Sequence, residues 1–391
     1  MNDGKLNRFQ IFLFILLAFS LPLSVSLSET FYFLAFVVWM IQIFIYKRPF
    51  RQTKLEIPVM VLAAVYIAAI LFSPSPSESA RILKKLILFG LIFLLANSPE
   101  TKAARCHLIN IWLSGAIIAS LWTMIEYIRG IPRADLGFFG CMTFGHFSPM
   151  FLGVSLSLIG LENYRRTSIL SALTFIAGVF ALFLTCTRGG WIGFIAGLAI
   201  FFIIKRKWLF LATSTVALIL IVLVLFTCFP KSRPGKAVRS LLHPFDRQVP
   251  RVAGSNLKRW YMYKASWEMF TEHPLLGIGP YQFEAQLPNY LPQEVKEKIF
   301  KHRSFNESQS IYFDYLSAMG IMGFSALLFF FYTIFRLLIS KYKSCNSAFD
   351  KNLTLGVLIA FISFCTGGLF EQIFHNSEVL LNLCFLLGLV L

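Results

Sequence analysis

The sequence predicts an all-α, polytopic integral membrane protein with about 12 transmembrane helices and one large, partly helical loop on the outer side. The first supporting observation is composition: 57% of the residues are hydrophobic, only 14% are charged, and 43 are phenylalanine. The second is that apolar runs recur along almost the whole chain. The third is that basic residues gather in alternate connections. This composition excludes a soluble domain with a packed core.

Twelve apolar stretches have roughly the length of a transmembrane helix, which takes about 20 residues. Nine of them lie in residues 1–229 and three in residues 309–391, with the large loop at 230–308 between them. The run after Arg8 lacks a small-residue cleavage site, so we interpret it as the first span and not as a signal peptide. The predicted spans are 9–27, 30–46, 57–73, 82–97, 107–127, 148–161, 169–185, 190–204, 208–229, 309–335, 353–370 and 377–391.

Basic residues give the orientation, because short cytoplasmic connections are enriched in lysine and arginine. The even number of spans places both termini on one side, and the basic connections share that side. They contain Lys5 and Arg8, Lys47 to Lys54, Lys102 and Arg105, Arg165 and Arg166, Lys205 to Lys207, and Arg336 to Lys351. We therefore expect both termini in the cytoplasm and the 230–308 loop outside.

Several classes of ligand are excluded. The formal charge of +17 follows the membrane topology and forms no nucleic-acid surface. The seven cysteines are scattered without a C-x-x-C pair, so neither a zinc site nor a disulfide framework is expected. Clustered outer carboxylates, which a divalent ion would need, are absent from the sequence. No glycine-rich nucleotide loop is present either. We expect no metal and no cofactor.

Arg188 interrupts the apolar pattern in "FLTCTRGGWIG", residues 183–193. A guanidinium near lipid costs several kcal/mol unless it is paired with another group, solvated by water or part of a functional site. Its predicted place is the turn between the seventh and eighth spans, on the outer side. It is either a snorkelling residue or part of a site for an anionic headgroup.

The large loop contains a second unusual arginine, in "KRWYMYKASWEMFTEHPLLGIGPYQFE", residues 258–284. From Arg259 to Phe270 the apolar and aromatic positions recur with helical spacing, which predicts an amphipathic helix at the membrane surface. Proline and glycine in "HPLLGIGP" then end the helix. The aromatic residues fit an interfacial anchor, whereas Arg259 begins the helix and is not explained by anchoring.

These motifs resemble those of the O-antigen ligase / O-antigen polymerase superfamily, and most closely those of an O-antigen ligase. The resemblance rests on Arg259 with the following "HPLLGIGPYQF", on "TCTRGGWIGFIAGL" around Arg188, and on "IYFDYLSAMGIMGF" at 311–324. The C-terminal "GGLFEQIFHNSEVLLNLCFLLGL" is also similar to one branch of the family. The resemblance covers roughly residues 140–391.

The resemblance implies a metal-independent enzyme in the bacterial inner membrane that acts on its periplasmic side. Such an enzyme takes a glycan from undecaprenyl pyrophosphate and passes it to lipid A–core. Arg188 and Arg259 would hold the pyrophosphate by bidentate hydrogen bonds as charge develops on it. Tyr312, which aligns with the family's tyrosine-leucine motif, and Gln309, three residues before it, would also contact substrate. The implied partners are the lipid-linked donor, the lipid A–core acceptor and membrane lipids, and no nucleic acid.

The sequence departs from the family pattern at the general base. Where the family has histidine followed by asparagine, this chain has Gln309 and Ser310, and glutamine cannot act as a base at neutral pH. Three residues could replace the histidine: His302 a few residues upstream, which is our first choice, Glu307 in the same stretch, and His375 at the outer end of the last span.

Three other functions remain open. A repeat-unit polymerase would use the same donor with a different acceptor; the modest 128–147 connection favours a ligase over it. A polytopic transporter is disfavoured, because no internal repeat is evident and acidic residues are almost absent from the spans. A non-catalytic protein that binds lipid-linked glycan would explain the missing histidine.

Overall fold

The computed structural model describes residues 3–132, 136–228, 232–233, 235–236, 238, 250–296 and 307–391. The described residues form helices and turns and no strand. The first part of the chain contains α1 Asp3–Ser20, α2 Val25–Phe44, α3 Glu56–Leu71, α4 Pro76–Ser79, η1 Ala80–Ile82, α5 Leu83–Leu88, α6 Gly90–Asn97 and α7 Pro99–Ile128. It continues with α8 Cys141–Leu158, η3 Glu162–Tyr164, α9 Arg165–Thr185, α10 Arg188–Ile204 and α11 Trp208–Thr227. The outer loop contains α13 Pro250–Glu272, α14 Phe283–Gln286, η4 Leu287–Tyr290 and α15 Gln293–Val295, and the chain ends with α16 Ile311–Ser344, α17 Ala348–Gly367 and α18 Ser377–Val390.

The all-helical fold class is confirmed for the described residues and is consistent with a polytopic membrane protein, whereas the number of twelve spans stays a prediction. Among the described residues, six helices are long and apolar enough to cross a membrane, namely α2, α7, α8, α9 with its preceding turn, α16 and α17. Three shorter apolar helices are α3, α10 and α18. Each predicted span overlaps a helix or, at 82–97, the neighbouring short helices η1, α5 and α6, although the bounds differ.

Several predicted boundaries were wrong, since α7 begins at Pro99 and not at 107, α16 continues to Ser344 beyond 335, and two further differences have a visible local cause. The first helix ends at Ser20 and the second begins at Val25, so the predicted span 9–27 runs across a turn. Pro22 lies in this turn, and the Ser24 side chain caps the next helix by accepting a hydrogen bond from the Leu27 N–H at 3.4 Å. Likewise α8 begins at Cys141 and not at 148, because Gly140 supplies a positive φ of 81° just before it.

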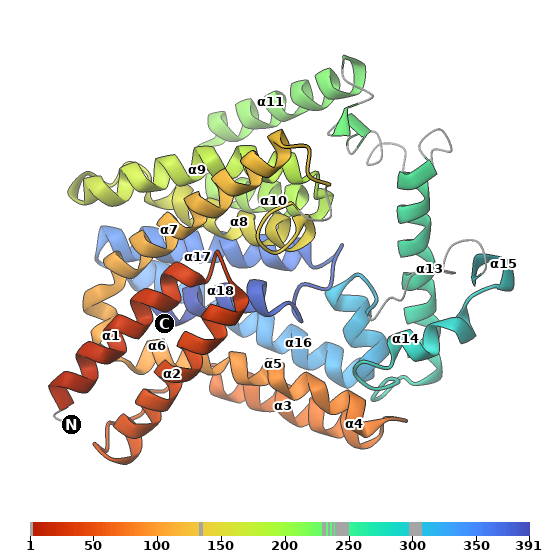
Figure 1. The fold of residues 1–391 in the computed structure, drawn as a ribbon, viewed down its shortest axis with the longest axis horizontal. Helices are drawn as coiled ribbons and strands as arrows, with labels where there is room; N and C mark the ends of the chain where they lie inside the picture. The colour runs from red at the N-terminus through yellow and green to blue at the C-terminus, as the bar shows by residue number, and fades with distance from the viewer. Residues whose placement is uncertain are drawn as a thin grey trace.

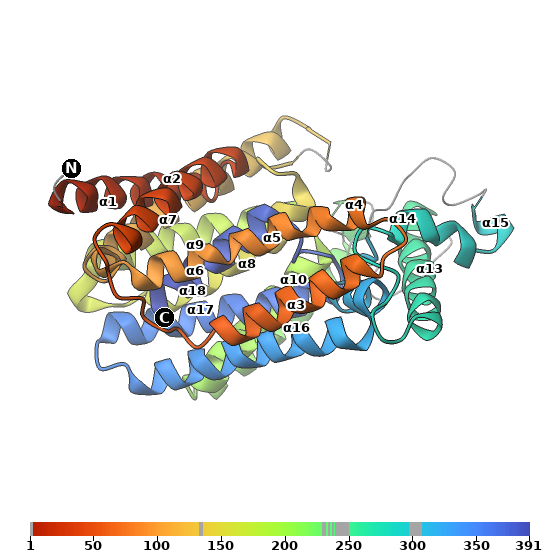
Figure 2. The ribbon, with the colours of Figure 1, turned by 90° about the horizontal axis from the view of Figure 1, so that it is seen from below.

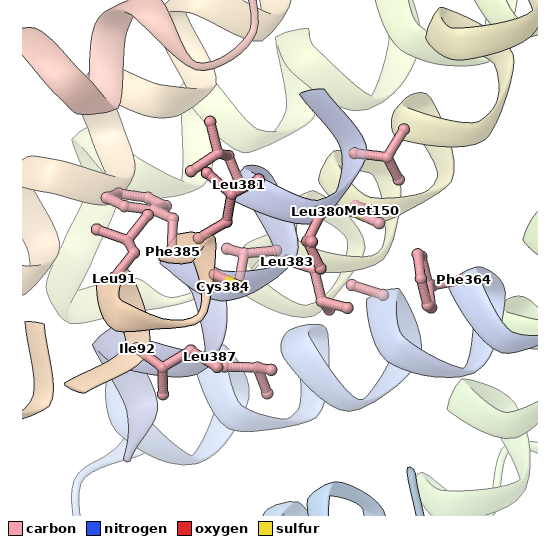
Figure 3. Packing of buried hydrophobic residues seen from close by; sticks show 14 of the residues in the cluster. Leu91, Ile92, Met150, Phe364, Leu380, Leu381, Leu383, Cys384, Phe385 and Leu387 are labelled. Atoms are coloured by element: carbon pink, nitrogen blue, oxygen red, sulfur yellow. The ribbon is translucent and has the colours of Figure 1, made fainter. Parts of the chain in front are cut away.

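The core lies around α17 and α18. Helix α17 packs against α8, α10, α16 and α18. Helix α18 is buried along almost its whole length, and Figure 3 shows its leucines between α6 and α17. One polar contact inside this core is satisfied: the Trp112 indole N–H donates to the Asn382 Oδ1 at 2.8 Å. By contrast, Phe33, Phe72 and Ile128 are 63%, 76% and 81% exposed, as expected for side chains that face lipid.

The outer loop has a small hydrophobic core of its own. It comprises Met262, Ala265, Met269, Ile278, Phe283, Leu287, Leu291 and Val295. The predicted amphipathic helix is present as α13, which buries one face in this cluster and exposes Trp260 and Trp267 on the other. Figures 1 and 2 show α13, α14 and α15 at one end of the molecule and both termini toward the opposite end.

The loop after α13 fastens onto a break in α16. Gly320 interrupts that helix with φ 60° and ψ −158°, which leaves nearby backbone groups without helical partners. The loop supplies these partners. The N–H groups of Ile278 and Gly279 donate to the carbonyls of Ser317 and Ala318, both at 2.9 Å. In the other direction, the Ile321 N–H donates to the Pro274 carbonyl at 2.8 Å.

Glycine is required on both sides of this contact. Gly277 has φ 67°, and a Cβ there would lie 2.4 Å from the Ser317 carbonyl oxygen. A Cβ at Gly320 would lie 2.5 Å from the Leu275 carbonyl oxygen. The motifs "HPLLGIGP" and "SAMGIMG" therefore form one backbone clasp, residues 274–279 against 317–322, which fixes the end of α13.

Candidate functional site

Arg188 lies in the first turn of α10. Cys186 adopts a left-handed conformation with φ 52° and ends α9, and Thr187 then begins α10. The Thr187 hydroxyl donates to the Cys141 carbonyl at 2.9 Å, which ties this turn to the start of α8. A cation in the first turn adds to the positive end of the helix dipole instead of offsetting it. The turn is therefore suited to an anion.

Arg259 reaches the same neighbourhood from α13. Its Nη2 donates to the Glu371 Oε2 at 3.1 Å, and both side chains are largely buried. Glu371 belongs to the segment 368–376, which connects α17 to α18. The start of α10 packs on this segment too, because a Cβ at Gly189 would lie 3.1 Å from the Phe370 Cβ. Arg259 and the first turn of α10, which carries Arg188, thus lie at one segment.

Tyr263 lies near both arginines. Its hydroxyl is within hydrogen-bond distance of the carbonyls of Gln309 and Leu369, at 3.2 and 3.3 Å. Burial raises the pKa of Tyr263, whereas the positive charges of Arg259 and Arg188 act to lower it. The structure therefore brings together two arginines that lie far apart in the sequence, as an anion clamp requires. We call Arg188, Arg259, Tyr263 and Glu371 the arginine cluster.

A second cluster, of opposite character, adjoins the same segment. The His375 Nδ1 lies 3.0 Å from the Glu307 Oε1 and 3.8 Å from the Asp314 Oδ2. The Gln372 side-chain amide donates to the Asp314 Oδ2 at 2.6 Å, and the Ser308 N–H donates to the Asp314 Oδ1 at 3.3 Å. We call Glu307, Asp314, Gln372 and His375 the histidine cluster.

The carboxylates determine how His375 carries its proton. Burial alone would lower the pKa of His375, but the charges of Glu307 and Asp314 together raise it above its usual value. Because Nδ1 faces carboxylate oxygens, it holds a proton, and Nε2 is the atom that can accept another. Within the described part of the chain, Nε2 is buried and has no hydrogen-bond partner. A histidine oriented by a carboxylate through one nitrogen is the arrangement of a general base.

The remaining predicted residues have different positions. His302 falls in 297–306, outside the described residues. Gln309 adopts a left-handed conformation with φ 59°, and its carbonyl contacts Tyr263. The Tyr312 hydroxyl donates to the Cys365 carbonyl at 2.9 Å, between α16 and α17. Among the described residues, no cluster of three or more histidine, cysteine, aspartate or glutamate side chains could hold a metal ion. Metal independence stays an expectation.

Sequence reasoning missed four members of these clusters, of which Tyr263 was interpreted only as one of the aromatic residues of an interfacial anchor. Glu371 and Gln372 lie in the quoted motif "GGLFEQIFHN", only a few residues before His375, but no periodicity indicates where they point. Asp314 lies in the first turn of α16, four residues after Ser310. The signal that could have found them is the unusual concentration of polar residues at the outer ends of these apolar helices.

A comparison with known families matches the central part of the chain. The model of the O-antigen ligase family matches residues 173–328. These residues form an O-antigen ligase family domain. The resemblance to the O-antigen ligase / O-antigen polymerase superfamily is thereby confirmed.

The matched O-antigen ligase domain contains both arginines, Tyr263 and Glu307, whereas Glu371 and His375 lie beyond it. The family includes O-antigen ligases and related polymerases, which are glycosyltransferase-like enzymes. A comparison with curated proteins found no match to the chain.

Proposed function

We propose that the protein is an O-antigen ligase. It transfers O-antigen polysaccharide from undecaprenyl pyrophosphate to lipid A–core, without a metal and with inversion at the anomeric carbon. The observation that carries the proposal is the meeting of Arg188 and Arg259 at Tyr263, beside a histidine oriented by a carboxylate.

The proposed topology has twelve spans in the bacterial inner membrane, with both termini cytoplasmic and loop 230–308 periplasmic. Basic connections at the other ends of the helices support it. There, Arg105 pairs with Asp350, Arg48 pairs with Glu100 at 3.3 Å, and Lys205 donates to Asn352. A periplasm-dependent reporter fused near Pro288 should be active, and the same reporter near Arg206 should be silent. The reverse pattern would overturn the topology and, with it, the site.

The arginine cluster would hold the leaving group. As the bond between the anomeric carbon and the pyrophosphate oxygen breaks, its electron pair stays on the undecaprenyl pyrophosphate. Two guanidinium groups can each contact a phosphate in a bidentate manner and stabilise that charge. Glu371 would keep Arg259 oriented through their 3.1 Å ion pair until the donor arrives.

The histidine cluster would supply the base that the family position lacks. The acceptor hydroxyl attacks the anomeric carbon, and its proton passes to the Nε2 of His375, while Glu307 stabilises the resulting imidazolium through Nδ1. Glu307 and His375, which the sequence offered as separate alternatives, thus become one catalytic pair. His302 remains the competing candidate, and its alanine variant is the direct comparison.

A lipopolysaccharide gel from a deletion strain tests the reaction. A ligase defect leaves intact lipid A–core without polymer and accumulates lipid-linked polymer. Loss of chain length with a single repeat still attached would instead identify a repeat-unit polymerase, the alternative that the family also includes. If the gel is unchanged, the remaining alternatives are a polytopic transporter and a non-catalytic protein that binds lipid-linked glycan.

A further inference from the structure

A cavity of about 520 Å³ opens at the same end of the molecule as the outer loop. Its lining comes from α2, from η1 and α5, from the loop after α13, and from the start of α18. The polar side chains that line it are Glu29, Tyr32, Arg81, Lys84, Lys85, Tyr281 and Ser377. This volume is within the usual range for sites of small ligands, about 300–1,000 Å³.

Three cations dominate this cavity. Arg81, Lys84 and Lys85 have the helical spacing that places them on one face, and Glu29 is the single carboxylate among the described lining residues. They are at the ends of the helices opposite the basic connections, where short connections normally carry few lysines and arginines. Arg81 and Lys84 are exposed, while Lys85 is partly buried and donates to the Ser377 hydroxyl at 2.7 Å. Such a cluster at the headgroup level is suited to an anion.

The cavity also adjoins the histidine cluster. Tyr281 lines it, and the Tyr281 ring centroid lies 6.1 Å from that of His375. Ser377 follows His375 by two residues and bonds to Lys85. A group held by these cations would therefore lie next to the proposed base. None of the residues that line the cavity belongs to the arginine cluster.

We propose that this cavity is a second anion site, which binds a phosphate group presented at the outer leaflet. Because it lies beside His375, it places the molecule that carries the phosphate within reach of the base; this part of the inference rests on the proposed function. The phosphate belongs either to the lipid A–core acceptor or to a phospholipid headgroup of the bilayer.

Binding is measured apart from transfer, so that the two proposals fail separately. The test variant is Arg81→Gln/Lys84→Gln, in which both exchanged side chains are exposed. The matched control is Lys47→Gln/Arg51→Gln, which removes the same charges from an exposed connection on the other face. The purified full-length proteins, in neutral detergent, are incubated with lipid A–core, with phosphatase-treated lipid A–core or with phosphatidylglycerol, and the retained molecules are counted by native mass spectrometry.

If the acceptor phosphate is the ligand, the test variant retains about 10- to 100-fold less lipid A–core than the control, as expected for lost charge-assisted hydrogen bonds. Phosphatase-treated lipid A–core is then bound equally by both variants. If a phospholipid is the ligand, retention of phosphatidylglycerol falls instead. Equal retention of all three molecules by both variants overturns the proposal, whether or not the wild type transfers glycan.

Transfer kinetics then test the positioning. With the acceptor as ligand, the test variant raises the KM for lipid A–core and leaves kcat close to the wild-type value. A fall in kcat with an unchanged KM contradicts an acceptor site. If the wild type transfers nothing, the proposed function is wrong, while the retention experiment still decides whether the cavity binds phosphate.

Discussion

The arginine cluster and the histidine cluster share the segment 368–376 but differ in charge and in the side chains they present. In the first, two guanidinium groups and one carboxylate leave an excess of positive charge next to a partly buried phenol. In the second, two carboxylates surround one imidazole. A transferase that acts on a lipid pyrophosphate needs both environments, one for the departing charge and one for the proton. The structure places them on one short connection between α17 and α18.

The largest expected effect comes from removing an arginine. Arg188→Ala and Arg259→Ala should each bring transfer close to the limit of detection, because stabilisation of a developing anion is worth about 10²–10³ in rate and donor binding is lost as well. Lysine should restore little, since it cannot make the bidentate contact. Transfer is measured with purified lipid-linked donor, and insertion is checked by membrane fractionation.

Lys264→Ala is the matched control for Arg259→Ala. Lys264 lies on the same helix and pairs with Glu268 at 3.7 Å on the exposed side. Full activity in either arginine variant would remove the clamp from the mechanism.

The next largest effect is expected in the histidine cluster, where substitution should change kcat and not donor binding. His375→Ala should lower kcat about 10²–10⁴-fold, the usual contribution of a general base, with little change in donor binding. Glu307→Gln should lower it less, because the imidazole stays in place without its charged partner. The measurement is single-turnover transfer at saturating donor. If His375→Ala is active and His302→Ala is not, the base is His302, and the histidine cluster is structural.

The pH profile gives a smaller effect with a defined sign. Because the pKa of His375 is raised, the rate should increase with pH through a midpoint above that of an ordinary histidine. Stability should change in the opposite direction: the contribution of protonated His375 is complete at low pH and is lost as pH rises through the raised pKa. The groups near His375 are Glu307, Asp314, Lys85, and the tyrosines Tyr281 and Tyr315.

Glu307→Gln sharpens this test. Removing one of the two carboxylates should lower the pKa of His375 and shift the rate profile toward lower pH. The pKa of Tyr281 is raised to about 12 by burial and by the nearby carboxylates, so Tyr281 should not titrate in the range measured. An unchanged profile in Glu307→Gln would contradict the proposed pairing.

The smallest effect is expected at the family's histidine position. Gln309→His should leave activity near that of the wild type, and histidine is among the residues that tolerate the φ of 59° found there. In the His375→Ala background it should restore part of the lost rate, since it returns a base to the other side of Tyr263. Initial rates of the single and double variants provide the comparison. No recovery would mean that position 309 does not reach the acceptor.

The sequence predicted the helices well because hydropathy is a local property that repeats over each span. It also indicated Arg188 and Arg259, because a charge within an apolar run is conspicuous. It could not pair Glu307 with His375, which are 68 residues apart, nor Arg259 with Glu371, which are 112 apart. Such contacts depend on how the helices pack. The boundary errors at Ser20 and Cys141 have a local cause, in caps and turns that hydropathy does not register.

The backbone clasp between residues 274–279 and 317–322 has a consequence for how this chain can evolve. Gly277 packs against the backbone of residues 317–319, and Gly320 packs against the backbone of residues 274–275. A side chain at either position would therefore disrupt the same contact. Natural selection should therefore treat them as a single unit, and related chains should keep the spacing within each half of the clasp constant.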